Sequence, residues 1–230
     1  MSVPTPLTYF RLDESSGNAT DQINSLTATN TSATYAAAKL NNGATYGGTA
    51  FHTITDNAAL KPTSDISFGG WVNFTSTASY QMLIAKGENA GDTRSYEMRA
   101  FASTTQIEVQ MKMGGATAQC RTTAGIGTAT WKHVIFTRTG TTQVIYVDAV
   151  AVALSSNVTQ SGTIDYSTDD LWFGQRNGGL RFNGRLDEIG IWNVALTSAE
   201  VTSLYNAGAG FDPTAGGAAP RTQLLMMGVG

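Results

Sequence analysis

The chain of 230 residues has little charge, a single cysteine and no long apolar run. The lone Cys120 excludes a disulfide framework within the chain, and one cysteine with two histidines cannot form the usual zinc cluster. Charged residues make up 13% of the chain, about half the usual fraction. Because the basic residues do not cluster, we expect no nucleic-acid partner. No stretch approaches the roughly 18 apolar residues of a membrane span, so we expect no membrane insertion.

What the sequence contains instead is a series of short β-forming runs separated by glycine, asparagine and aspartate. Residues 66–74 show the pattern most clearly, because apolar side chains alternate on one face and Trp71 falls on the other. The other runs are residues 7–12, 50–55, 81–85, 94–100, 106–113, 131–138, 142–148, 170–174 and 182–192. Many short strands at near-regular spacing predict an all-β fold, a two-sheet antiparallel jelly-roll β-sandwich.

One short helix is expected near the C-terminus, over residues 196–206. Thr197 is its N-cap and Glu200 follows three residues later, which is a capping box. Gly208 lies just past the end of the segment, where a left-handed residue commonly ends a helix.

The composition changes after the helix, which divides the chain into two parts. We expect the sandwich to span residues 1–211, and residues 212–230 to form a linker and an apolar C-terminal tail. Such a tail either packs back on its own domain or docks onto a neighbouring protein. The candidate docking residues are Leu224, Leu225, Met226 and Met227.

Six motifs occur in an order that resembles a known family. They are YFRLDESSG at residues 9–17, ISFGGWV at 66–72, IAKG at 84–87, WKHV at 131–134, VIYVD at 144–148 and FNGRLDEIGIW at 182–192. The chain is similar in this respect to the concanavalin A-like lectin/glucanase superfamily, and to its laminin-G-like and pentraxin-like jelly rolls. The resemblance implies the jelly-roll fold, but this fold hosts lectins, adhesion modules, glycan hydrolases and structural proteins.

The acidic residues argue against an enzyme. Retaining glycosidases need two carboxylates about 5 Å apart, and the glucanases of this fold carry a Glu-x-Asp-x-x-Glu-like strand that this chain lacks. The acidic pairs here, such as Asp187-Glu188, are adjacent, and neighbours on a strand point to opposite faces. Glu97 and Glu108 are isolated. We therefore expect a non-catalytic module, and a glycoside hydrolase is the least favoured function.

Calcium is the cofactor that the resemblance suggests, because laminin-G-like and pentraxin-like domains often bind it at a loop rim or near the chain ends. Calcium takes oxygen ligands from carboxylates, amides and backbone carbonyls. The matching positions are Asp56 with Asn57, or Asp13 with Asp187. Aspartate and asparagine also cap turns by bonding their own backbone, so a purely structural role is the alternative.

Glycan binding is a frequent use of the family's fold. It requires aromatic rings that stack on sugar C–H surfaces and amides that bind hydroxyl groups, exposed together on one rim. The candidate glycan-binding residues are Tyr96, Tyr166, Gln175 and Asn177.

Two settings for such a module remain open. Relatives usually act outside cells, yet the chain starts at a bare Met1 without an export signal. A virion protein of a tailed bacteriophage, assembled in the host cytoplasm, would reconcile these facts. It would decorate the capsid or tail as a homo-oligomer and dock on other virion proteins through its C-terminal tail, and this role is compatible with glycan binding. The alternative is a glycan-binding or adhesion module of a secreted bacterial protein, which would be extracellular or on the cell surface.

Overall fold

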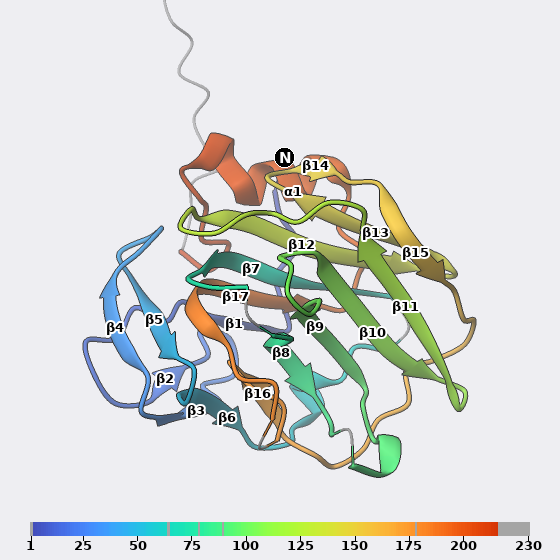
Figure 1. The fold of residues 1–230 in the computed structure, drawn as a ribbon, viewed down its shortest axis with the longest axis horizontal. Coiled ribbons are helices and arrows are strands. Elements are labelled where there is room, and N and C mark those ends of the chain that lie inside the picture. Colours follow the sequence, from blue (N-terminus) through green and yellow to red (C-terminus); the bar gives the residue numbers. More distant parts are fainter. Residues whose placement is uncertain (1, 64, 78, 89, 178, 216–230) are drawn as a thin grey trace, which may run out of the picture.

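Two sheets stack face to face and enclose the main core (Figure 1). The structure, a computed structural model, describes residues 2–63, 65–77, 79–88, 90–177 and 179–215. Every pairing between named strands is antiparallel. The predicted all-β jelly-roll sandwich with one short helix is confirmed.

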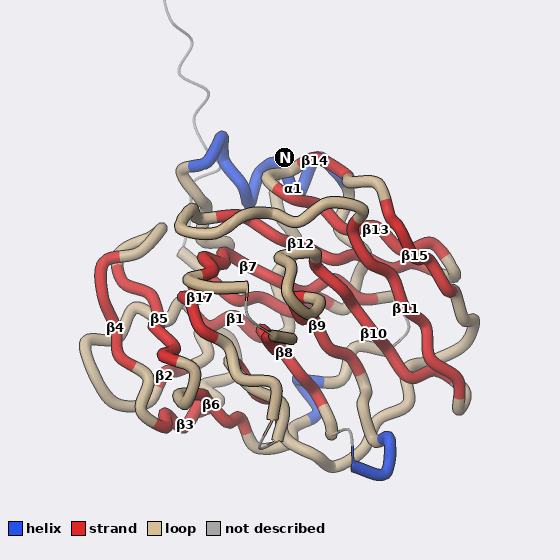
Figure 2. The backbone as a smooth tube through the Cα atoms, viewed as in Figure 1, coloured by secondary structure: helices blue, strands red, loops and turns tan. Residues whose placement is uncertain are grey.

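The elements follow in two sheets, and strands dominate the backbone (Figure 2). The eight-stranded sheet contains β1 (Thr8–Phe10), β4 (Thr34–Ala37), β5 (Asn42–Gly47), β7 (Ile66–Phe74), β12 (Lys132–Thr139), β13 (Thr142–Val147), β14 (Val150–Ala151) and β17 (Asn183–Trp192). The nine-stranded sheet contains β2 (Ala19–Thr20), β3 (Thr27–Thr31), β6 (Phe51–Ile54), β8 (Gln81–Lys86), β9 (Tyr96–Ala100), β10 (Ile107–Met113), β11 (Ala116–Thr122), β15 (Leu154–Val158) and β16 (Leu171–Phe173). The helices are α1 (Ser198–Tyr205) and the 3-10 turns η1 (Ala58–Leu60), η2 (Ala90–Asp92) and η3 (Asn206–Gly208).

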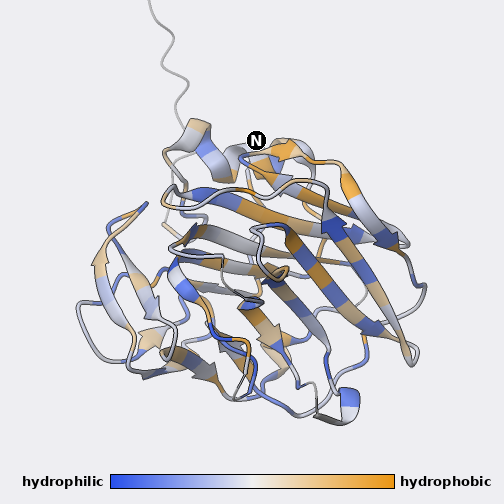
Figure 3. Ribbon diagram, viewed as in Figure 1, coloured by the Kyte–Doolittle hydropathy of each residue, from blue (hydrophilic) through white to orange (hydrophobic). Residues whose placement is uncertain are grey.

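Alternation along the strands produces the main core between the sheets. On β7, Phe68 and Phe74 face this core, whereas Trp71 lies outside it. Aromatic rings from both sheets meet there edge to face, as Phe10 and Phe173 do with ring centroids 5.3 Å apart. Hydrophilic and hydrophobic residues also alternate along β10 and β11 (Figure 3), so these strands keep a polar outer face.

The two outer faces of the sandwich differ. Helix α1 buries Val201 and Leu204 in a second, smaller core with Tyr9, Ile135 and Trp192 of the eight-stranded sheet. This packing covers part of the outer face of that sheet. No α-helix of the described chain packs on the outer face of the nine-stranded sheet, and the side chains that this face carries on β9 and β10, such as Glu97 and Glu108, are polar but largely buried.

Each strand that the sequence predicts is present, with ends that differ by at most two residues. The prediction missed β2, β3, β4, β5, β11, β14 and β15. These strands are short or rich in threonine, alanine, serine and asparagine, so they lack the large apolar residues that mark a strand in a single sequence.

Helix α1 begins as the sequence predicts, with the complete capping box of Thr197 and Glu200. Its end is different, because the left-handed residue that ends the helix is Asn206, with φ 48°, and not Gly208. Asparagine tolerates this conformation better than most residues. Within the described residues, no helix is long and apolar enough to cross a membrane.

The capping box gives a first testable prediction. Thr197→Ala removes the hydroxyl that accepts the Glu200 backbone N–H, and we expect it to lower the free energy of unfolding by about 1 kcal/mol. Calorimetry would then show a Tm lower by about 2–4 °C. Thr202→Ala is the control, because this exposed hydroxyl bonds the Ser198 carbonyl within the helix. Equal losses in both variants would contradict the role of the cap.

Candidate functional site

A β-bulge in β17 sets the direction of two adjacent acidic side chains. The pairing of β17 with β7 shifts register between Asp187 and Gly190, and Glu188 has a left-handed φ of 55°. Neighbours on a regular strand point to opposite faces, but the bulge re-aims Glu188 and brings its carboxylate close to that of Asp187. The expectation that adjacent acids lie on opposite faces is therefore wrong for this pair.

Gly70 of β7 makes room for this bulge. A Cβ atom at position 70 would lie 2.4 Å from the Glu188 carbonyl oxygen and 2.9 Å from that of Asp187. Both distances are well inside van der Waals contact, so a larger residue would push β17 away from β7. The position of the acidic pair thus depends on glycine in the neighbouring strand.

Three carboxylates meet where β1 ends beside the bulge. Each of Asp13, Asp187 and Glu188 has an oxygen within 4.8 Å of the other two. Asp13 follows β1, and β1 pairs with β17, so the segments that supply these acids are neighbours in one sheet. We call these three residues the carboxylate centre. The sequence paired Asp13 with Asp187, and the fold adds Glu188 through the bulge.

Hydrogen bonds from the β4–β5 connection hold two of these carboxylates. Asp187 Oδ2 accepts the backbone N–H groups of Lys39 and Leu40, at 3.0 and 2.9 Å. Asp13 Oδ1 accepts the backbone N–H of Asn42 at 3.2 Å. The centre therefore ties three separate segments of the chain together.

The carboxylate centre lacks a positive partner within the described chain. Asp187 is 0% exposed and Glu188 4% exposed, and the oxygens Asp187 Oδ1 and Glu188 Oε2 are buried without a hydrogen-bond partner. None of the ion pairs among the described residues involves the centre. Burial raises the pKa of Asp187 to about 7 and the pKa of Glu188 to about 9. A buried carboxylate without a counter-charge takes up a proton more readily, and a bound cation would replace that proton and stabilise the ionised groups.

The donor set suits a hard cation. Calcium takes roughly six to eight oxygen ligands. The centre offers carboxylate oxygens from three residues, and two of these oxygens, Asp187 Oδ1 and Glu188 Oε2, have no hydrogen-bond partner among the described residues. Structural zinc sites instead use sulfur and nitrogen ligands. The residues present therefore fit the calcium ion that the resemblance implies.

The other calcium candidate, Asp56 with Asn57, does not form such a site. The two Asp56 oxygens each lie 2.8 Å from an ammonium group, those of Lys61 and Lys86. Asn57 caps η1 by accepting the backbone N–H of Ala59 at 2.9 Å. A calcium ion here would face two positive charges, so this expectation is wrong and the alternative structural role holds.

The four glycan candidates do not share one surface. Tyr96 is 0% exposed and Gln175 is 3% exposed, so neither can contact a sugar, and the Tyr96 hydroxyl instead donates to the Leu60 carbonyl at 2.9 Å. Asn177 is exposed and bonds Glu88, and Tyr166 is partly exposed. The expectation is therefore wrong for Tyr96 and Gln175. The tail residues Leu224, Leu225, Met226 and Met227 lie outside the described residues.

The outer face of the nine-stranded sheet carries a chain of ion pairs that sequence reasoning missed. Arg176 Nη1 lies 2.9 Å from Glu97 Oε2, and Arg99 Nη1 lies 3.1 Å from Glu97 Oε1. Arg99 Nη2 lies 2.5 Å from Glu108 Oε1, and Arg121 Nη1 lies 3.7 Å from Glu108 Oε2. We call these five residues the charge ladder. Both glutamates look isolated in the sequence, and only the register of β9, β10 and β11 brings the charges together.

Aromatic rings cover one end of the ladder. The Arg99 guanidinium lies 5.0 Å from the centroid of the Tyr80 ring, and that of Arg121 lies 3.9 Å from the centroid of Phe101. Tyr80 and Phe101 contact each other edge to face at 5.0 Å. Guanidinium groups held by both carboxylates and rings have little freedom left to lose when a ligand binds.

A polar recess lies near the ladder, at the rim of the same sheet. It measures about 210 Å³ and is lined by Asp92, Thr93, Arg94, Lys112, Asp165, Tyr166 and Ser167. Hydrogen bonds link the wall of the recess to the charge ladder. Arg94 donates to Gln110 of β10, and Gln110 donates to Glu108 at 3.2 Å. A second, mostly apolar groove of about 310 Å³ lies where β11 ends, beside Ile126, Val147 and Val152.

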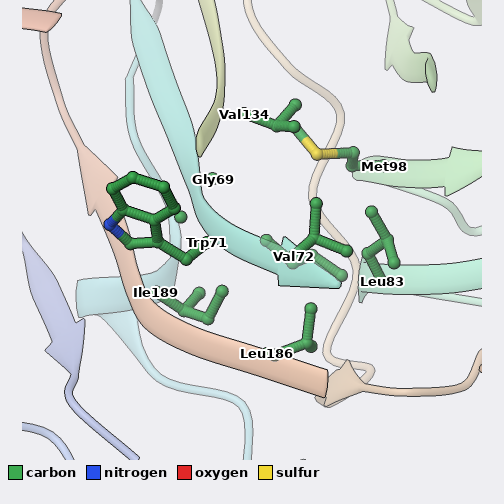
Figure 4. A pocket seen from close by; sticks show the side chains of 10 residues that line it. Gly69, Trp71, Val72, Leu83, Met98, Val134, Leu186 and Ile189 are labelled. Atoms are coloured by element: carbon green, nitrogen blue, oxygen red, sulfur yellow. The ribbon is translucent and has the colours of Figure 1, made fainter. Parts of the chain in front are cut away.

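The interior also contains a small void between the sheets (Figure 4). Val72, Leu83, Met98, Val134, Leu186 and Ile189 line it with apolar side chains, beside Gly69, Gly70 and Trp71 of β7. Its volume of about 10 Å³ is no more than one water could occupy. This void is a feature of packing and cannot hold a ligand.

Comparisons with solved structures find the same fold in a toxin binding domain, in one domain of an arabinanase and in part of a sialidase. The binding domain of Paraclostridial Mosquitocidal Protein 1 aligns with a TM-score of 0.71 at 15% identity, over 88% of this chain and 52% of that one. Domain 4 of AbnA, an extracellular arabinanase from Geobacillus stearothermophilus solved with arabinotriose, aligns with a TM-score of 0.68 at 15% identity, over 87% and 98%. Trypanosoma rangeli sialidase in complex with sialic acid aligns with a TM-score of 0.65 at 16% identity, over 92% and 35%. The chain thus spans about half of the mosquitocidal binding domain and a third of the sialidase.

The family follows from the sequence itself. A search of curated proteins finds no match, but the family model described as the concanavalin A-like lectin/glucanases superfamily matches residues 46–202. This segment covers more than half of the chain and includes most of the motifs that carry the resemblance. The chain belongs to the concanavalin A-like lectin/glucanases superfamily.

Proposed function

We propose that this protein is a non-catalytic glycan-binding module whose fold is stabilised by a bound calcium ion. The observation that carries the glycan-binding function is the outer face of the nine-stranded sheet. It presents the edges of three arginine side chains, 10–23% exposed and fixed by the buried Glu97 and Glu108, beside aromatic rings, and no α-helix of the described chain packs on it. Sites for small polar ligands combine such convergent polar groups with apolar walls.

The charge ladder supports binding rather than bond cleavage. Glu97 accepts Arg99 and Arg176, and Glu108 accepts Arg99 and Arg121. A glycosidase needs one carboxyl group to protonate the leaving oxygen and a second one free to attack the sugar or to activate water. The guanidinium groups occupy the oxygens of both glutamates, which leaves neither group available for these steps. Asp187 and Glu188 lie close together, but they are 0% and 4% exposed, so a glycan cannot reach this pair.

Relatives of the same fold add support. The AbnA domain was solved with arabinotriose, and for botulinum neurotoxin type C, cell entry depends on interaction with two ganglioside molecules. Identities of 12–15% show the fold alone, so ligands are not transferred from these proteins. They support glycan binding, which both the virion protein and the module of a secreted protein would allow. The virion role, the partners of the C-terminal tail and the homo-oligomer stay predictions.

The calcium ion would be held by Asp13, Asp187 and Glu188. When bound, it would supply positive charge to three carboxylates of which two are buried. This would tie the segment after β1 to the bulge of β17 and to the β4–β5 connection, which bonds the same aspartates. We infer a structural role, because the centre is distinct from the charge ladder and from the recess.

Calcium should therefore raise the thermal stability of the protein. After treatment with EDTA, we expect addition of calcium at about 100 times its Kd to stabilise the fold by roughly 2.7 kcal/mol. The corresponding rise in Tm is about 5–10 °C, measured by differential scanning fluorimetry. Magnesium should give a smaller rise because it demands stricter octahedral geometry. Equal Tm values with calcium and with EDTA would contradict the calcium site.

Asp187→Asn separates metal binding from folding. The amide oxygen can still accept the N–H groups of Lys39 and Leu40, while the uncompensated charge is removed. We expect the metal-free variant to be at least as stable as the metal-free parent, and its Tm to be insensitive to calcium. Asp148→Asn is the matched control, because Asp148 pairs with Lys132 on another part of the surface, and it should keep the full response. A calcium response retained by Asp187→Asn would count against the assignment.

Glycan binding is tested on the full chain with a glycan array, followed by calorimetric titration of the glycans that are retained. We expect binding of one or more oligosaccharides and no release of reducing sugar from the matching polysaccharide after long incubation. Reducing-sugar release would show that the module is an enzyme. The absence of any retained glycan, with calcium present, would overturn the glycan-binding function.

A further inference from the structure

The recess at the rim of the nine-stranded sheet has the size and the chemistry of a site for one sugar ring. It lies between η2, the turn that joins β10 to β11, and the segment around Asp165 and Tyr166. Its volume is about 210 Å³. The walls come from three segments that are distant in sequence, so the recess is a product of the fold.

On one wall of the recess, the side chains of Arg94 and Lys112 both donate hydrogen bonds to the Asp92 carboxylate. Arg94 donates to Asp92 Oδ1 through Nε at 3.0 Å and Nη2 at 2.7 Å, and Lys112 donates to Asp92 Oδ2. Arg94 Nη1 also donates to Gln110. An arginine has five N–H groups and a lysine has three. Two N–H groups of Arg94 and two of Lys112 therefore have no partner among the described residues.

The recess has almost as many free hydrogen-bond acceptor sites as free N–H donors. Asp165 accepts the backbone N–H groups of Gly114 and Gly115, at 3.0 and 2.8 Å, which fixes its position. A carboxylate offers about four lone-pair sites, so Asp165 keeps about two and Asp92 about one for a ligand. The formal charges of Asp92, Asp165, Arg94 and Lys112 cancel.

An aromatic ring forms the remaining wall. The Tyr166 hydroxyl donates to the Pro62 carbonyl at 2.7 Å, and the ring meets that of Tyr96 edge to face, with centroids 6.5 Å apart. The ring is thus fixed before any ligand binds, and it is partly exposed at the recess. A fixed ring beside polar groups is the usual arrangement for contact with the C–H surface of a sugar.

We propose that this recess binds an uncharged sugar ring through adjacent hydroxyl groups. The inference rests on the glycan-binding function proposed above and names its site and ligand class. Each hydroxyl group has one O–H donor and two acceptor lone pairs, so adjacent hydroxyls can bond the free N–H groups and the free carboxylate lone pairs of the recess together. A carboxylated or sulfated sugar could pair with Arg94 and Lys112 only while it lies beside the carboxylates of Asp92 and Asp165, and a cationic ligand could pair with these carboxylates only beside the two cations.

The test compares variants of the full chain by calorimetric titration, with arabinotriose, xylotriose and maltotriose as neutral probes and with any neutral glycan retained on the array. The acidic probes are trigalacturonate and sialyllactose. We expect Lys112→Gln and Tyr166→Ala each to weaken binding of the neutral ligand roughly tenfold. Asp92→Asn is a second variant on an exposed side chain, and we expect a similar loss. Neutral ligands should bind equally at low and high salt, because little Coulomb attraction is involved.

Lys132→Gln is the matched control, because Lys132 forms a similar surface pair with Asp148 away from the recess. We expect its affinity to stay within about twofold of the parent. Parent-like binding by Lys112→Gln, Asp92→Asn and Tyr166→Ala, each with an unchanged Tm, would overturn the recess while the glycan-binding function stands. Preferential binding of acidic probes would overturn the ligand class. A parent protein that binds no glycan would overturn the glycan-binding function, and the recess with it.

Discussion

A carboxylate removed from water needs positive charge or several hydrogen bonds, and this requirement organises the polar part of the molecule. On the nine-stranded sheet, three guanidinium groups meet the need for Glu97 and Glu108. At the carboxylate centre the described chain supplies no ion pair, and two buried oxygens lack any partner. At the recess, charges and hydrogen-bonding groups nearly balance. One constraint thus distinguishes the charge ladder, the proposed cation site and the proposed site for a neutral ligand.

The fold determines where each of these solutions can arise. The bulge of β17 requires a glycine in β7, and it brings adjacent acids close to each other. Helix α1 covers part of one outer face of the sandwich, which leaves the opposite face for polar side chains. On that face, antiparallel register places Glu108 opposite both Arg99 and Arg121. Arginines that are ion-paired and stacked on rings form a surface that changes little when a ligand binds.

Much of the fold could be predicted from sequence, and less of the site. Strands such as β7 can be predicted because large apolar residues alternate along them. By contrast, β4 and β15 carry mostly small or polar residues, and they form strands because neighbouring strands pair with them. The pairing of Asp13 with Asp187 could be expected from the family resemblance. The orientation of Glu188 could not, because a bulge leaves no mark in one sequence. The burial of Tyr96 and the contacts of Glu97 depend on register, which a single sequence does not give.

The most direct test of the account is a titration of the isotope-labelled protein, loaded with calcium, with its neutral oligosaccharide, followed by the amide resonances in NMR. Binding in the recess predicts shifts at Thr93, Gly114 and Gly115, whose backbones surround Asp92 and Asp165. It also predicts no shifts on the far face, where α1 packs. Shifts centred on α1 or on the β4–β5 hairpin, with Gly114 and Gly115 unmoved, would contradict it.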